Sequence, residues 1–242
     1  MNRRSVADLA GSVGLGAWAA FGVLTMIVIG RGGSPLSQDD QLLAWSLGHR
    51  PDEWLALARG VTATGTGVVP YALVVLAGIF VGHTARHRLA AALLGLVCLM
   101  AGQALRYGVM LLVHRPRPPR ADWATHASGW SFPSGHTTTA ALTACILVVA
   151  VQLRAPRGRT LLTAVIAVWG LAVGLTRAEL AVHWSTDVLG GWLFAAGWAG
   201  LCLCVACWWL PDRFVPREAG ATVEPMDSRE AVEGRAAQDP GR

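Results

Sequence analysis

Three short groups of polar residues interrupt an otherwise apolar sequence, and they hold the side chains that could carry out a reaction. They lie at residues 114–120, 133–136 and 176–187. Together they contain histidines, arginines and an aspartate. Such side chains can supply a nucleophile, a general acid and the cations that stabilise a developing anion.

His183 and Asp187 are four residues apart, a spacing that places two side chains on one face of a helix. The carboxylate could then accept a hydrogen bond from one imidazole nitrogen and fix the tautomer of the ring. The other nitrogen would be free to attack, as in an oriented nucleophile. His136 is a candidate general acid. Each feature also has an ordinary structural interpretation, a helix-stabilising His–Asp contact and a capping histidine.

The second polar group is suited to bind an anion. Ser134, Gly135 and His136 are expected to form the first turn of a helix, where backbone N–H groups lack internal partners and carry partial positive charge. Glycine lets a ligand approach the backbone closely, and helix N-termini of this kind bind phosphate. Arg117 and Arg177 would add planar guanidinium groups that match phosphate oxygens. The combination predicts a phosphate site.

The composition indicates that lipid surrounds these groups. The 242 residues are 53% hydrophobic and only 14% charged, whereas soluble domains carry about 25% charged residues. All 20 basic residues are arginines, in short clusters between apolar runs, so the net charge of +5 indicates membrane-flanking segments and not a nucleic-acid surface. The five cysteines lie inside apolar runs and are expected to be small hydrophobic residues without disulfides.

The expected fold is all-α, a bundle of six transmembrane helices with short amphipathic interfacial helices. A span needs about 20 apolar residues. The first candidate has no clear cleavage site and is therefore interpreted as a helix and not a signal peptide. Residues 39–59 are expected to form one or two interfacial helices. Residues 1–210 would be one membrane domain, and residues 211–242 a disordered cytoplasmic tail. The expected spans are 10–30, 66–83, 89–113, 136–153, 160–176 and 188–210.

Arginine counts give the orientation. With the N-terminus inside, nine arginines fall in short cytoplasmic segments: Arg3, Arg4, Arg86, Arg88, Arg154, Arg157, Arg159, Arg213 and Arg217. The outer segments hold arginines too, so the bias is moderate. In this topology all three polar groups meet on the extracytoplasmic face of the cell membrane. Polar side chains that converge at one side of a membrane domain indicate a functional site.

The three groups resemble the signature of the type 2 phosphatidic acid phosphatase and vanadium haloperoxidase superfamily. That signature is Lys-x6-Arg-Pro, then Pro-Ser-Gly-His, then Ser-Arg-x5-His-x3-Asp. This sequence has Arg117-Pro118, Pro133-Ser134-Gly135-His136 and Arg177-x5-His183-x3-Asp187 in the same order. The six-span layout is similar to that of the membrane-bound bacterial lipid phosphatases of the superfamily.

The resemblance implies a role for each matching residue. His183 would be the nucleophile that forms a phosphohistidine, Asp187 its orienting carboxylate and His136 the acid that protonates the leaving group. Arg117, Arg177, Ser134 and Gly135 would hold the phosphate. No metal or other cofactor is implied, and the sequence has no carboxylate cluster suited to magnesium. The implied partners are membrane lipids and a lipid phosphate substrate: phosphatidic acid, phosphatidylglycerol phosphate or a prenyl pyrophosphate.

Two positions depart from the signature. Thr176 replaces the family serine and keeps a hydroxyl, whereas Met110 replaces the family lysine and has no charge. Arg106, one helical turn earlier, is a tentative replacement for that cation. Arg115 and Arg120 are expected to face water or headgroups, and His49, His83, His87, His114 and His126 are expected to take no part in the site. The alternative functions are a non-catalytic lipid-binding relative and a vanadate-dependent haloperoxidase.

Overall fold

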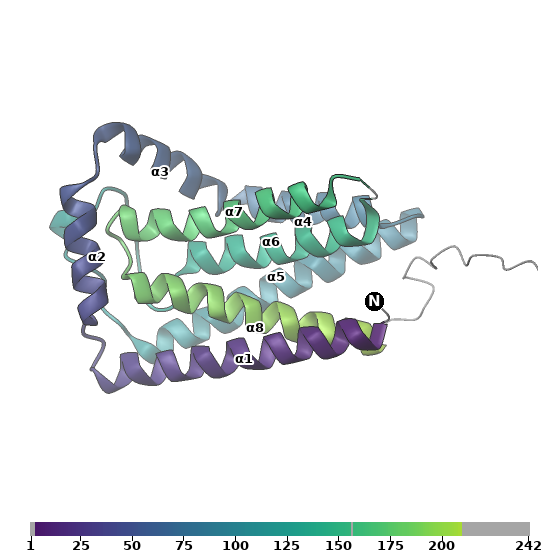
Figure 1. Ribbon diagram of the computed structural model, residues 1–242, viewed down its shortest axis with the longest axis horizontal. Helices are drawn as coiled ribbons and strands as arrows, with labels where there is room; N and C mark the ends of the chain where they lie inside the picture. The colour runs from purple at the N-terminus through teal and green to yellow at the C-terminus, as the bar shows by residue number, and fades with distance from the viewer. Residues whose placement is uncertain (1–2, 156, 210–242) are drawn as a thin grey trace, which may run out of the picture.

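The computed structural model describes residues 3–155 and 157–209, and in this part of the chain all regular structure is helical (Figure 1). The expected disordered tail, residues 211–242, lies outside the described residues. The helices are α1 (Arg3–Gly30), α2 (Ser37–Gly48), α3 (Asp52–Thr64), α4 (Val68–Val81), α5 (Ala85–Val113), the 3-10 helix η1 (Arg120–Asp122), α6 (Gly135–Arg154), α7 (Arg159–Glu179) and α8 (Ser185–Trp209).

Five of the six expected spans are confirmed. Helices α1, α5, α6, α7 and α8 are each long and apolar enough to cross a membrane. They extend the expected bounds by a few residues, most of all α1, which begins at Arg3. Their exposed surfaces carry many large apolar side chains, as expected for helices that face lipid.

The expected second span, residues 66–83, is the exception. Helix α4 has only 14 residues, so it is about 21 Å long and does not match a hydrocarbon core of roughly 30 Å. It qualifies as a span only together with α3, to which it is joined at an angle of 50°. The break contains Gly65, and a Cβ atom there would lie 2.3 Å from Val173 of α7. Close packing against α7 therefore requires glycine at the bend.

Helices α1 and α8 pack side by side through small residues. At Gly200 a Cβ atom would lie 2.7 Å from the carbonyl oxygen of Ala10 and from the Cα of Gly14. Small residues let membrane helices approach closely, and they compensate for the weak driving force between helices in lipid. Because α8 begins beside the polar groups, this contact fixes the helix that carries Asp187.

An aromatic cluster includes Phe132, three residues before the start of α6. Phe132 stacks on Phe21 with ring centroids 5.7 Å apart, and Phe194 packs against the edge of Phe21 at 5.5 Å. All three side chains are buried. Phe132 directly precedes Pro133, so the cluster anchors the turn that leads into α6.

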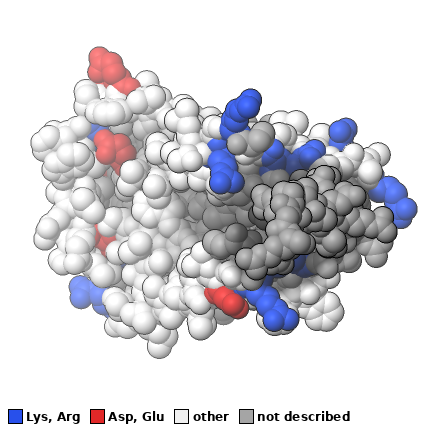
Figure 2. Space-filling view, turned by 45° about the vertical axis from the view of Figure 1, so that its right-hand side comes forward, with Lys and Arg blue, Asp and Glu red and all other residues white. Residues whose placement is uncertain are grey.

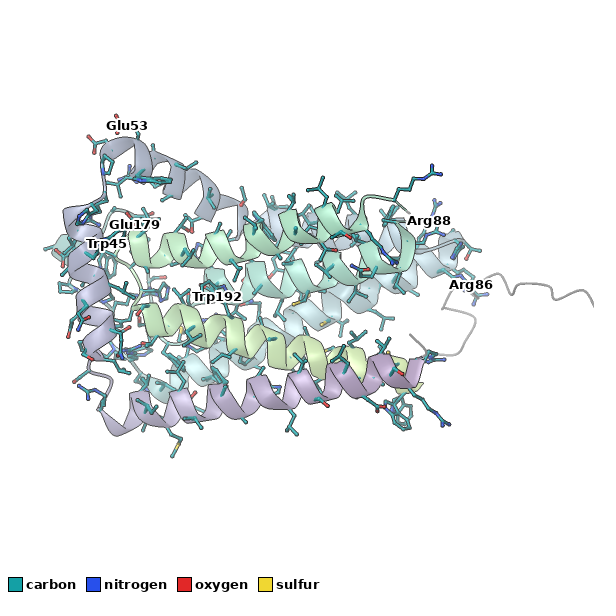
Figure 3. The ribbon with its side chains drawn as sticks, viewed as in Figure 1. Trp45, Glu53, Arg86, Arg88, Glu179 and Trp192 are labelled. Carbon is teal, nitrogen blue, oxygen red and sulfur yellow. The ribbon has the colours of Figure 1, made fainter. Side chains whose placement is uncertain are left out.

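The two ends of the bundle differ in chemistry. Helix α2 lies across the end where α7 finishes and α8 begins, with α3 beside it (Figure 1). Trp45 and Glu179 are at this end, whereas Arg86 and Arg88 are at the opposite end (Figure 3). On the face shown in Figure 2, the side chains coloured as Lys or Arg lie mainly on the right, the side turned toward the viewer. The segment 39–59 thus folds into parts of two helices, one of the two outcomes expected from its sequence.

Candidate active site

Arg117 lies in the connection between α5 and α6 and joins two of the three polar groups. Its guanidinium donates to the carbonyl oxygens of Ser128, Gly129, Trp130 and Val182 at 2.7–3.1 Å. Its Nη1 also lies 2.9 Å from Nε2 of His183. All five N–H donors of the group are therefore used, and the arginine is held rigidly against the histidine.

His183 and Asp187 meet as predicted, but not on a helix. His183 belongs to the loop before α8, and Asp187 lies in the first turn of that helix. The distance from His183 Nδ1 to Asp187 Oδ2 is 3.4 Å, and the histidine is only 4% exposed. The helical-face explanation is therefore wrong, although the pairing itself is confirmed. A loop turning into a helix N-terminus brings the two side chains together.

Asp187 is surrounded by donors. Its Oδ2 accepts hydrogen bonds from the backbone N–H of Trp184, at 2.9 Å, and from the hydroxyl of Ser131. Its Oδ1 lies 2.6 Å from Nη1 of Arg115. The aspartate is fully buried. Hydrogen bonds and a cationic partner favour the charged form of a buried carboxylate, so this network holds an oriented anion beside His183.

The turn 133–136 begins a helix, as predicted. Ser134 is the N-cap residue of α6, which starts at Gly135. The backbone N–H of Ser134 donates to the carbonyl oxygen of Asp187 at 3.1 Å, which ties this turn to α8. The Ser134 hydroxyl is buried and pairs with that of Thr137 at 2.9 Å. The remaining N–H groups of the first turn form a site of positive partial charge.

Arg106 and Arg177 approach this turn from α5 and α7. A Cβ atom at Gly135 would lie 3.5 Å from the guanidinium carbon of Arg106, so the arginine lies over the helix start. Arg106 also donates to the sulfur of Met110 at 3.3 Å, and Arg177 donates to Thr62 Oγ1 at 3.1 Å. The Nε atoms of both arginines are buried without a hydrogen-bond partner among the described residues.

His136 is the point on which the cationic side chains converge. It lies within electrostatic range of His183 and of the guanidinium groups of Arg106, Arg117 and Arg177. These side chains come from four different parts of the chain: α5, the connection that follows it, α7 and the loop before α8. The structure thus brings together every candidate site residue that the sequence indicated.

Burial sets the ionisation of His183. Removal from water lowers the pKa of this imidazole from 6.5 to about 4, and the charges of Arg117 and Arg177 act in the same direction. The hydrogen bond and the charge of Asp187 oppose this shift without cancelling it. At neutral pH the His183 imidazole is therefore uncharged, with a lone pair available on one nitrogen. Burial also lowers the pKa of the neighbouring Arg117 guanidinium.

Arg115 was expected to face water or headgroups, and that prediction is wrong. Its side chain is completely buried and contacts Asp39 as well as Asp187. An arginine between prolines in a polar loop resembles a surface residue, and its acidic partner Asp39 lies 76 positions away in the chain. The available signal was a second Arg-Pro pair directly before Arg117-Pro118.

Several other polar residues have contacts outside the cluster around His136 and His183. Arg120 is exposed and lies over the Trp123 ring, His49 stacks on Trp45, and His114 packs against Trp130. His83 contacts Arg154 far from the site. The five cysteines are unpaired and half-buried within helices. Across residues 3–155 and 157–209, no group of three or more His, Cys, Asp or Glu side chains could hold a metal ion.

The sequence matches the family model described as PAP2 superfamily over residues 91–211. This region contains all three polar groups and amounts to half of the chain. The chain belongs to the PAP2 superfamily. The resemblance that the three motifs indicate is thereby confirmed.

Curated relatives of this PAP2 protein are lipid phosphatases. It is 38% identical over 98 residues to phosphatidylglycerophosphatase B of Escherichia coli K12, a match that covers 40% of this chain and 35% of the relative. It is 32% identical over 142 residues to undecaprenyl-diphosphatase BcrC of Bacillus subtilis, covering 56% and 67% of the two chains. The chain thus spans about a third of the E. coli relative.

A solved structure supports the fold. The crystal structure of a transmembrane PAP2-type phosphatidylglycerolphosphate phosphatase from Bacillus subtilis superimposes with a TM-score of 0.69 and 22% sequence identity. The match covers 85% of this chain and 98% of the other. This PAP2 protein therefore has the helical arrangement of a membrane-bound member of the superfamily.

Proposed function

We propose that this protein is a membrane lipid-phosphate phosphatase that works through a phosphohistidine at His183. The main support for this proposal is the position of the imidazole, which lies between Arg117 on its Nε2 side and Asp187 on its Nδ1 side. A guanidinium can only donate, so Nε2 must be the acceptor and the ring proton must reside on Nδ1. The lone pair of Nε2 is then directed into the cluster of cations.

The first chemical step follows from that tautomer. Nε2 of His183 attacks phosphorus, and the bond from phosphorus to the leaving oxygen breaks. The negative charge of the bound phosphate would offset the surrounding guanidinium groups and favour protonated His136, which donates the proton that the leaving oxygen takes up. As the phosphoryl group reaches Nε2, it replaces the contact with Arg117, whose Nη1 donor becomes available to a phosphate oxygen. Asp187 stabilises the positive charge that develops on the imidazole.

The second step returns the enzyme to its starting state. His136, now neutral, accepts a proton from a water molecule that attacks the phosphohistidine. The bond from phosphorus to Nε2 breaks, and inorganic phosphate leaves. Arg106, Arg177, the Ser134 hydroxyl, which accepts from Thr137 and keeps its own proton to donate, and the N–H group of Gly135 would hold the equatorial oxygens in both steps. The two arginines have unpaired Nε donors, and Ser134 and Gly135 lie at the N-terminus of α6. Both features are suited to bind a dianion.

The proposed substrate is a phosphate monoester or pyrophosphate on a lipid. The relatives bear the names phosphatidylglycerophosphatase and undecaprenyl-diphosphatase, which gives phosphatidylglycerol phosphate and prenyl pyrophosphate as the leading substrates and phosphatidic acid as a third. The site lies at the end of long apolar helices, where a lipid in the surrounding membrane places its phosphate. We propose that this end is extracytoplasmic, since Arg86 and Arg88, which belong to one of the short arginine-containing segments expected in the cytoplasm, lie at the other end (Figure 3).

A phosphate-release assay tests this function. Purified protein in detergent should release inorganic phosphate from phosphatidylglycerol phosphate, phosphatidic acid or undecaprenyl pyrophosphate, and His183→Ala should release none. Vanadate should inhibit the reaction, because it adopts the five-coordinate geometry that phosphorus has in the transition state. EDTA should leave the rate unchanged, since the proposed mechanism uses no metal. Restoration by magnesium after chelation would contradict it.

The same assay separates the alternatives. A non-catalytic relative would bind lipid phosphate but release nothing from any of the three substrates. A haloperoxidase would oxidise halide with peroxide after vanadate is added, whereas the proposed phosphatase would only be inhibited. The helical arrangement shared with a membrane phosphatase favours the phosphatase.

A further inference from the structure

Arg115 and Asp39 form a buried ion pair behind the proposed catalytic aspartate. Nη2 of Arg115 lies 2.7 Å from Oδ2 of Asp39, and both side chains are completely excluded from solvent. Nη1 of the same guanidinium lies 2.6 Å from Oδ1 of Asp187. One arginine thus bridges two carboxylates. Removing one member of such a buried group would leave its partners without charge compensation.

Asp39 also fixes the start of the helix that carries Asp187. Its Oδ1 accepts hydrogen bonds from the Ser185 hydroxyl at 2.7 Å and from the backbone N–H of Thr186 at 2.9 Å. These are the first two residues of α8. A carboxylate in this position satisfies free N–H groups and interacts favourably with the helix dipole. Helix α2, which lies across the end of the bundle, therefore supplies the cap of α8.

The hydrogen bonds of Asp187 show what the bridge does. Arg115 occupies Oδ1, so the carboxylate cannot rotate to exchange its two oxygens without losing a charged partner. Oδ2 is then left for Trp184, Ser131 and His183. The Nδ1 proton of His183 needs an acceptor at a fixed place if Nε2 is to face the phosphate.

We infer that Asp39 and Arg115 are positioning residues for the proposed reaction: Arg115 orients Asp187 toward His183, and Asp39 holds Arg115 and the start of α8. This inference rests on the proposed function, because it assigns the pair to the nucleophile of that mechanism. Neither residue touches the phosphate. Both act through Asp187, so they should affect the rate of phosphoryl transfer and leave substrate affinity unchanged.

The first test compares Asp39→Asn with Asp40→Asn. Asp40 is the next residue of α2 but is exposed, so its variant controls for loss of a negative charge at this helix end. In the phosphate-release assay, Asp39→Asn should lower kcat by about 10–100-fold, the range typical of groups that orient a ligating residue, with KM changed by less than about twofold. Asp40→Asn should match the wild type in both constants.

The second test compares Arg115→Lys with Arg120→Lys. A lysine at 115 keeps the charge but cannot bridge two carboxylates with a planar fork, so kcat should fall while KM and the melting temperature stay near wild type. Arg120, exposed in the same connection, should tolerate the change. In rapid-quench experiments the Arg115→Lys variant should form the phosphohistidine more slowly.

The outcomes separate the two proposals. If the wild type releases no phosphate, the proposed function fails. If the wild type is active and Asp39→Asn equals Asp40→Asn in kcat, the positioning role is wrong. A variant whose activity falls only in proportion to its folded fraction, measured by gel filtration and circular dichroism, would also overturn it, because that result indicates a purely structural ion pair.

Discussion

The two sides of the candidate site differ in how far their polar groups are satisfied. On one side, Arg115, Asp187 and Arg117 have their hydrogen-bonding groups occupied by protein partners. On the other side, the Nε atoms of Arg106 and Arg177 are buried and, among the described residues, have no such partner. We call these the saturated side and the open side. Each side contains both buried and half-buried members, Arg115 and Arg117 on the first and Arg177 and Arg106 on the second, so depth alone does not explain the contrast.

The contrast separates positioning from substrate binding. Buried polar groups in proteins are nearly always paired, because an unpaired one loses its hydration without compensation. Unpaired guanidinium donors beside a helix N-terminus are therefore expected to gain partners from an anionic ligand. On the saturated side, Nδ1 of His183 lies 3.4 Å from Asp187 Oδ2 without a well-aligned hydrogen bond, whereas the groups of Arg115, Asp187 and Arg117 are paired and hold one another in place. Substitutions on the two sides should consequently have different kinetic signatures.

The largest loss of activity should come from replacing the proposed nucleophile, His183, or its hydrogen-bond acceptor, Asp187, on the saturated side. His183→Ala should abolish turnover and leave no trappable phosphoenzyme. Asp187→Asn should lower kcat by about 10⁴-fold, the cost of the corresponding change in an oriented histidine of a serine protease. The measurement is phosphate release with acid-quenched labelling of the protein. Appreciable labelling of the His183→Ala variant would show that another residue is the nucleophile.

On the open side, Arg106→Ala should lower kcat/KM by about 10–150-fold, equivalent to about 1.5–3 kcal/mol for a lost hydrogen bond to a charged group. Since Arg106 would bind the substrate phosphate directly, part of the loss should appear in KM. Adding Met110→Lys should restore much of the activity, because it returns a cation to the position where the family has one. Arg120→Ala is the matched control.

No change on Arg106→Ala would remove that residue from the phosphate site. Its contacts with Met110 and Gly135 would then be packing contacts between α5 and α6. An increase in activity on Met110→Lys alone, with no loss on Arg106→Ala, would point the same way.

A smaller effect concerns pH. Because the folded-state pKa of His183 is lowered to about 4 from 6.5, the unfolded chain binds more protons than the folded one between these values. Stability contributed by this site should therefore fall as pH decreases from about 6.5 toward 4. The melting temperature of the wild type should drop relative to His183→Gln over this window. Above pH 7 the difference between the two proteins should be constant.

The smallest effect on activity is expected from two cysteine substitutions that test which end of the bundle faces outward. Both variants should be as active as the wild type. Ser128→Cys places a thiol at the exposed surface near Arg117, and Thr160→Cys places one at the start of α7 at the opposite end. In intact cells a membrane-impermeant thiol reagent should label the first and not the second. The reverse pattern would put the site in the cytoplasm. The unsubstituted chain controls for its native cysteines.

The sequence predicted the parts of the fold that depend on local pattern. Long apolar runs identified five helices, and the spacing of Arg117, His136, Arg177, His183 and Asp187 identified one site. The α3–α4 bend was missed because the need for Gly65 comes from Val173, a residue of another helix. Arg115 was misassigned for a similar reason: its burial depends on Asp39, and the Arg115-Pro116 pair is the local feature that distinguishes it from the exposed Arg120.

The phosphate cluster of this chain has only guanidinium groups as its cations, because the sequence contains no lysine and Met110 stands where its family has one. Reagents that acylate side-chain amines therefore have no target in it, whereas dicarbonyl compounds that condense with guanidinium groups do. The variant Met110→Lys would introduce the only side-chain amine of the chain, next to Arg106. A single substitution thus gives this site the one side-chain attachment point for an amine-reactive spectroscopic probe, beside the backbone α-amino group.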